Sequence, residues 1–107
     1  MANDRLAQLR SMLEEEPGDP FLRYAIALER KRAGDMEGAA TDLETLLRED
    51  PGYIACYYQL AMVLADLGRV QEAIEACRAG GLQCLVTGDG KARSELQALM
   101  RSLEEDA

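Results

Sequence analysis

The chain has 107 residues, which is enough for one hydrophobic core and too few for two. It carries 20 acidic and 12 basic residues, and the resulting net charge of −8 argues against nucleic acid and anionic membrane surfaces as partners. No leader and no run of about 18 apolar residues stands out, so we expect a soluble, cytoplasmic protein. Plentiful Ala, Leu, Glu and Arg, all good helix formers, favour an all-α fold.

The first helix is expected over residues 4–16, where apolar residues recur at helical spacing. They are Leu6, Leu9, Met12 and Leu13, which stand 34 residues before Ala40, Leu43, Leu46 and Leu47. The segment is therefore predicted to be a detached second helix of a repeat whose first helix is missing.

Residues 17–50 form the first full unit and residues 51–86 the second. Placing Pro17 on Pro51 aligns identical residues 34 positions apart, namely Gly18 with Gly52, Tyr24 with Tyr58, Ala27 with Ala61, Gly34 with Gly68 and Ala39 with Ala73. Each unit is predicted to hold two helices joined at its second glycine, because a residue after a helix C-cap often needs a positive φ. Asp35 can cap the next helix in the first unit, whereas Arg69 gives a weaker start in the second.

The second unit loses its pattern after Ile74. Gly80 and Gly81 stand where small or apolar residues should continue, so a helix from about 70 to 86 is expected to be weakened at this pair. A final amphipathic helix, residues 89–105, is predicted to turn Leu96, Leu99, Met100 and Leu103 inward. The chain is thus expected to be a single domain of about six antiparallel helices.

A 34-residue helix-turn-helix unit with small residues at the helix crossing resembles the tetratricopeptide repeat. The residues that carry this resemblance are Ala27 and Ala61, Gly34 and Gly68, Ala39 and Ala73, and the closing Pro51. The chain departs from the family pattern at Arg23, Arg30, Cys77 and Leu85. The resemblance covers residues 4 to about 86 and implies about two and a half units with end helices.

The resemblance implies binding of a peptide or partner helix in a concave groove lined by the first helix of each unit. By position in the unit, the groove would show Phe21, Tyr24, Leu28, Lys31 and Arg32, then Ala55, Tyr58, Met62 and Asp66. Family members that grip chaperone C-terminal carboxylates use Lys and Asn where this chain has Tyr24 and Leu28, so that clamp is absent. The two tyrosines, one repeat apart, either anchor the ligand or pack between neighbouring helices.

The segment Thr87-Gly88-Asp89-Gly90-Lys91-Ala92 looks like a phosphate-binding loop. A Walker loop needs a glycine five residues before its Gly-Lys pair and a hydroxyl residue after it, but Leu85 and Ala92 stand at those positions. We therefore expect a connector between helices, with Asp89 as N-cap.

No enzymatic site, metal or cofactor is expected. The chain has no histidine, which removes the commonest general base and leaves Cys56, Cys77 and Cys84 short of a zinc ligand set. Three cysteines without a secretory signal are more typical of buried thiols in a reducing compartment. The acidic runs at residues 14–16 and 104–106 are expected to be solvated.

One local basic cluster, Arg23, Arg30, Lys31 and Arg32, lies in the first unit. It either steers an acidic partner segment or balances neighbouring carboxylates such as Glu29. The sequence thus predicts a protein-interaction adaptor with an unidentified protein partner. The alternative is a self-associating structural protein, a homo-oligomer in which an exposed end of the stack pairs with another copy.

Overall fold

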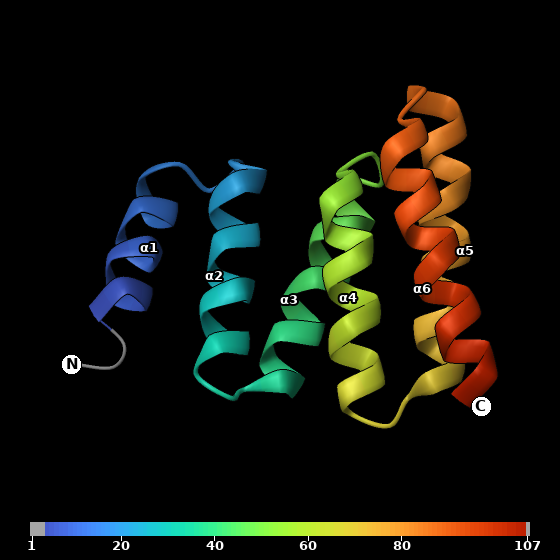
Figure 1. The fold of residues 1–107 in the computed structure, drawn as a ribbon. Coiled ribbons are helices and arrows are strands. Elements are labelled where there is room, and N and C mark those ends of the chain that lie inside the picture. Colours follow the sequence, from blue (N-terminus) through green and yellow to red (C-terminus); the bar gives the residue numbers. More distant parts are fainter. Residues whose placement is uncertain (1–3, 107) are drawn as a thin grey trace.

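A computed structural model describes residues 4–106, which form six α-helices and no strand (Figure 1). The helices are α1 (Asp4–Glu15), α2 (Pro20–Arg32), α3 (Met36–Glu49), α4 (Ile54–Asp66), α5 (Val70–Thr87) and α6 (Gly90–Asp106). Each helix packs against the next along the chain, and α4 also contacts α6. The predicted all-α stack of antiparallel helices is confirmed. None of the described helices is both long and apolar enough to cross a membrane.

The two turns inside the repeats have the same geometry. Gly34 and Gly68 follow α2 and α4 with φ of 89° and 78°, as the sequence predicts for residues in the left-handed region. The next residue in each turn donates its backbone N–H back into the helix, from Asp35 to Arg30 O at 2.9 Å and from Arg69 to Leu64 O at 2.8 Å. These bonds satisfy carbonyls that a helix end otherwise leaves without partners.

The starts of the helices differ in strength. The Asp35 carboxylate accepts a hydrogen bond from Gly38 N at 2.9 Å, and the Asp89 carboxylate accepts one from Ala92 N at 3.1 Å, so both predicted caps are confirmed. Asp19 caps α2 in the same way, at 2.9 Å from Phe21 N. Arg69 provides no side-chain cap for α5 and instead forms two hydrogen bonds to Glu72 at 2.7 Å.

The main core extends from α2 to α6. Four small residues at the helix crossings, Ala27, Ala39, Ala61 and Ala73, are completely buried, as their repeated positions suggest. A second, smaller cluster lies between α1 and α2 and consists of Leu6, Leu9, Leu22 and Ile26. The first helix is therefore held by a cluster of its own, separate from the main core.

The structure explains the glycine pair in α5, which was predicted to weaken that helix. The helix runs through Gly80 and Gly81 without a break, and Gly80 is buried. A Cβ at Gly80 would lie 2.6 Å from the Tyr57 Cβ of α4 and 2.8 Å from Leu96 Cδ1 of α6, whereas a Cβ at Gly81 would meet open space. Gly80 is thus required for the close approach of three helices.

Candidate functional site

Three of the predicted groove residues come together near the end of α2. Leu28, Lys31 and Arg32 line a hollow of about 340 Å³ with two residues that the sequence did not single out, Met36 and Gln59. Lys31 Nζ donates a hydrogen bond to Gln59 Oε1 at 3.0 Å, which links α2 to α4 across the hollow. The site therefore combines apolar side chains with two cationic ones.

The two predicted tyrosine anchors differ in environment. Tyr24 is half-buried and packs against Tyr53, with ring centroids 5.2 Å apart and ring planes at 43°. Burial raises the pKa of Tyr24, with smaller contributions from Cys56 and Tyr53. Tyr58 is 38% exposed. Tyr58 is therefore the more accessible of the two aromatic rings.

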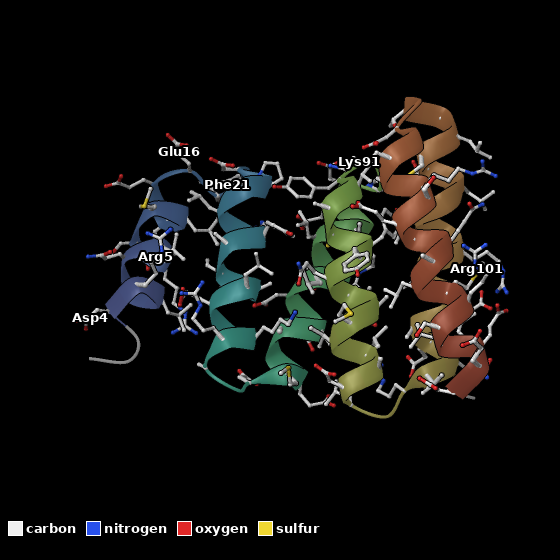
Figure 2. All side chains as sticks on the ribbon, in the orientation of Figure 1. Asp4, Arg5, Glu16, Phe21, Lys91 and Arg101 are labelled. Carbon is white, nitrogen blue, oxygen red and sulfur yellow. The ribbon has the colours of Figure 1, made fainter. Side chains whose placement is uncertain are left out.

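The remaining predicted positions are spread along α2 and α4. Phe21 is 58% exposed and lies at the end of α2 that follows the α1–α2 connection (Figure 2). Met62 is half-buried, while Ala55 and Asp66 are exposed at opposite ends of α4. These residues extend the candidate surface beyond the hollow.

Carboxylates pair with three members of the basic cluster. Arg23 Nε lies 3.7 Å from Glu49, Arg30 Nε 3.2 Å from Asp42, and the mostly exposed Arg32 3.8 Å from Glu29. Two of these partners, Asp42 and Glu49, belong to α3. Lys31, by contrast, has the neutral Gln59 as its hydrogen-bond partner. The positive charge of the hollow is therefore carried mainly by Lys31 and by the exposed end of Arg32.

The pair of Arg30 and Asp42 is the most enclosed of these ion pairs. Both Arg30 Nε and Asp42 Oδ2 are cut off from solvent, and their contact lacks the angles of a hydrogen bond. Burial raises the pKa of Asp42 even though Arg30 opposes this shift. The pair joins α2 to α3 through atoms that are buried, so we assign it to the packing of these two helices.

The sequence did not identify three residues of this region, Met36, Gln59 and Tyr53, and the reason is physical. Met36 is the first residue of α3, outside the helices expected to line the groove, and Gln59 corresponds in the first unit to the small Ala25. Comparison of the two units thus gave no repeated signal for Gln59, and the apolar pair of Met36 and Val70 lies on helices that were not expected to line the groove. Tyr53 precedes α4 in a connector, where helical periodicity does not apply.

A larger groove lies elsewhere, between α3 and α5. Its volume is about 550 Å³, and α4 forms its floor with Tyr57, Leu60 and Leu64. The α3 wall includes Leu47, and the α5 wall includes Ala76 and Ala79. No sequence pattern pointed to this second hollow, because its floor residues look like ordinary core positions of α4.

The three thiols are buried and unpaired, as the sequence suggests. Burial raises the pKa of Cys56 to about 12 and that of Cys77 to about 11. Cys56 Sγ also donates a hydrogen bond to Leu43 O at 3.4 Å. Within residues 4–106, no group of three or more His, Cys, Asp or Glu side chains is arranged to hold a metal ion. These thiols therefore act as small apolar residues in the core.

The glycine-rich segment that resembles a phosphate loop connects two helices. Thr87 ends α5, Gly88 takes a φ of 78°, and Asp89 caps α6. The backbone N–H of Asp89 donates to Cys84 O at 3.1 Å. The predicted connector is thus observed.

Comparison with known proteins identifies relatives of the chain. The sequence profile of the tetratricopeptide repeat matches residues 31–83. TPR repeat-containing protein PA0015 of Pseudomonas aeruginosa is 28% identical over 96 residues, which cover 90% of this chain and 91% of the relative.

Solved structures give the same picture. The solution structure of a tetratricopeptide repeat domain protein from Salinibacter ruber is 34% identical, with a TM-score of 0.80 over 83% of this chain and 90% of that one. The TPR2B domain of yeast Sti1, solved in complex with pHsp70, has a TM-score of 0.87 over 95% of this chain and 82% of that one. Its identity of 16% shows a shared fold alone.

Proposed function

Because this chain belongs to the tetratricopeptide repeat family, whose fold generally mediates protein–protein interaction, we propose that it binds a peptide or a partner helix along α2 and α4. The observation that carries this proposal is the hollow formed by Leu28, Lys31, Arg32, Met36 and Gln59. It is a cationic and partly apolar site in a protein of net charge −8.

The chemistry of the hollow suggests the chemistry of its ligand. Leu28 and Met36 offer apolar contact, and Lys31 offers an ammonium group whose hydrogen-bond partner is the neutral amide of Gln59. A segment with an acidic side chain next to an apolar one would satisfy both features. We propose Tyr58, which directly precedes Gln59 on α4, as an aromatic anchor. Met62 lies one turn further along α4, and Phe21 lies at the start of α2.

Tyr24 has a different role in this proposal. Its contact with Tyr53 holds the start of α4 against α2, so it shapes the surface as much as it offers area to a ligand. Replacing Tyr24 would therefore disturb the fold as well as the site. Tyr58 and Lys31 are the cleaner positions for a test.

The test is site-specific photo-crosslinking in cells, with a photoreactive amino acid at Tyr58 and, as a control, at Arg101 on the outer edge of α6 (Figure 2). We expect a specific crosslinked protein from position 58, and we expect its yield to fall strongly when Lys31→Glu is added. Arg93→Glu, at an exposed position of α6, makes the same charge change away from the site and should leave the crosslinking yield unchanged. Equal loss with both charge changes, or identical products from positions 58 and 101, would contradict binding at this surface.

A further inference from the structure

The end of α5 carries a concentration of exposed apolar side chains. Leu82, Leu85 and Val86 are 61%, 60% and 80% exposed, although they are large and branched. Their spacing of three and four residues places them on one face of the helix. The helix has 18 residues against 14 in α3, and its end rises beyond α4 together with the start of α6 (Figure 1). This apolar tip therefore extends beyond the end of α4, beside the start of α6 (Figure 1).

A complementary hollow lies on the same helix, closer to its start. The groove between α3 and α5 has an apolar floor and, on its α5 wall, the small residues Ala76 and Ala79. Ala79 precedes Leu82 by three residues and Val86 by seven, so all three lie along one stripe of the helix. A protruding tip and a hollow thus follow one another on a single surface.

We propose that two copies of this chain associate through α5 in an antiparallel, two-fold arrangement, with the apolar tip of each copy seated in the α3–α5 groove of the other. A two-fold axis between residues 80 and 81 places Leu82 of one copy against Ala79 of the other, and Val86 beside Glu75 on the α5 wall of the groove. Ala79 is small and exposed on this stripe, which allows the two helices to approach closely. Such a pairing closes on itself, because each copy contributes the same tip and the same groove.

The charges around the groove are compatible with a second copy. The carboxylates on the α5 side of the groove, Glu72 and Glu75, already pair with Arg69 and Arg78 of the same chain. The rim therefore offers little net charge to attract a basic partner helix. At longer range the two copies repel each other, since each has a net charge of −8, and salt screens this repulsion.

The available area predicts a weak dimer. Three side chains at these exposures present on the order of 300 Å². Two tips and the two grooves that receive them bury about 1,200 Å² in total, which is the lower end of the range for specific interfaces. We therefore expect a dimer that dissociates on dilution. The interface uses α3, α4 and α5 residues that do not line the hollow at Lys31, so it stands independently of the proposed peptide-binding surface.

The first test is sedimentation equilibrium of the whole chain over a concentration series. We expect the mass to rise from one copy toward two, and the double variant Leu82→Ser with Val86→Ser to weaken association by at least about tenfold. Met12→Ser, which removes an exposed apolar side chain of α1, is the matched control and should leave association unchanged. Ala79→Arg fills the groove from the other side and should also give a monomer. A wild-type chain that stays monomeric throughout the series would overturn the proposal, as would dimers that the Leu82 and Val86 changes leave intact.

Two further measurements check the geometry and the kind of occupant. A mixture of the Ala79→Cys and Leu82→Cys variants is expected to form a disulfide between positions 79 and 82 of two copies under mild oxidation, while Arg101→Cys on α6 is not. Higher salt is expected to strengthen the association, because it screens the repulsion between two acidic chains. Efficient oxidation at position 101 but not between positions 79 and 82 would contradict the axis, and dissociation in high salt would contradict an apolar contact between copies.

Discussion

Gly80 sets the distance between three helices. Its missing side chain lets Tyr57 of α4 and Leu96 of α6 approach the α5 backbone together. The hydroxyl of Tyr57 in turn donates to Pro51 O at 2.5 Å, which ties α4 back to the connector before it. A single glycine thus allows a buried aromatic ring to hold several elements in place.

The glycine pair gives a sharp prediction at this scale. Gly80→Ala should lower the free energy of unfolding by about 1 to 3 kcal/mol, because the new methyl group overpacks a contact with backbone-near atoms. Gly81→Ala is the matched control and should be neutral or stabilising by up to about 1 kcal/mol, because it gains helix propensity in open space. Urea denaturation followed by circular dichroism measures both. Equal effects of the two changes on the free energy of unfolding would show that helix propensity alone accounts for them. The close contact of Gly80 with Tyr57 and Leu96 would then be unimportant for stability.

The buried thiols give a second prediction. Because Cys56 has a pKa of about 12 and Cys77 one of about 11, both should resist a thiol reagent at pH 8 and react once the chain is unfolded. A raised pKa in the folded state means that the native chain keeps a proton which the unfolded chain releases above its ordinary pKa of about 8.5. This contribution to stability is complete below pH 8.5 and is lost progressively as the pH rises toward the folded values.

The reaction is measured by the absorbance of the chromophore that the thiol reagent releases, with and without denaturant. The urea midpoint of unfolding is measured as a function of pH. Cys56→Ala should show a shallower decline of the midpoint between about pH 8 and 9.5 than the parent chain. Fast reaction of Cys56 in the native protein would show that its surroundings open readily.

The helix boundaries illustrate which elements sequence reasoning can reach. Gly34, Gly68 and the caps Asp35 and Asp89 act through local backbone chemistry, so the sequence alone predicts the end of α2, the start of α3, the end of α4 and the start of α6. The role of Gly80 was out of reach, because its cause is contact with residues 23 positions before it and 16 after it on two other helices. Local signals therefore predict these helix boundaries. The prediction that α5 is weakened at Gly80 was wrong because it depends on packing between distant helices.

The cap of α3 allows a quantitative test of such a local signal. Asp35→Ala should cost about 1 kcal/mol of stability, because Gly38 N loses its acceptor, whereas Asp35→Asn keeps an acceptor and should stay within a few tenths of a kcal/mol. Urea denaturation measures the free energy of unfolding of each variant, and its slope against urea concentration should stay unchanged. A comparable loss with Asn would assign the effect to the charge near Arg30 instead of the cap.

At the scale of the whole molecule, the core is divided unequally. The main cluster unites α2 to α6, while α1 rests on α2 through Leu6, Leu9, Leu22 and Ile26. Met12 of α1 is 51% exposed although Leu46, one repeat later, is only 1% exposed. The first helix therefore buries less apolar surface than its counterpart α3, and the apolar cluster that holds it joins it to α2.

Local opening of α1 follows from this division. We expect its amides to exchange with solvent faster than those of α4 and α5, because opening α1 disrupts the small cluster and leaves the main core intact. Leu9→Ala should accelerate exchange in α1 while the protection of α5 changes little. Hydrogen exchange read by mass spectrometry tests both statements. Simultaneous loss of protection in every helix would mean that the chain unfolds as one cooperative unit.

The candidate site was reached only in part from the sequence. The repeat placed Leu28, Lys31 and Arg32 on one face, and the structure adds Met36 and Gln59 to their hollow. The groove between α3 and α5 could not be foreseen, because a hollow depends on the space left between helices and not on the period of either one. The apolar residues at the end of α5 were visible in the sequence, but their exposure depends on the extra length of that helix relative to its neighbours.

The matching turns at Gly34 and Gly68 make the chain modular. Both turns use the same backbone hydrogen bonds and nearly the same φ. The connectors that precede the two units also match, because Asp19 N donates to Glu16 O and Tyr53 N donates to Asp50 O, each at 3.1 Å, so the unit between Pro17 and Asp50 has the same kind of junction at both ends. A duplicate of residues 17–50 inserted after Asp50 would therefore join both neighbours in register. The outcome would be a longer protein with two Lys31-type hollows one repeat apart, one with Gln59 and one with the duplicated Ala25 in its place, a scaffold with adjustable length and adjustable valency.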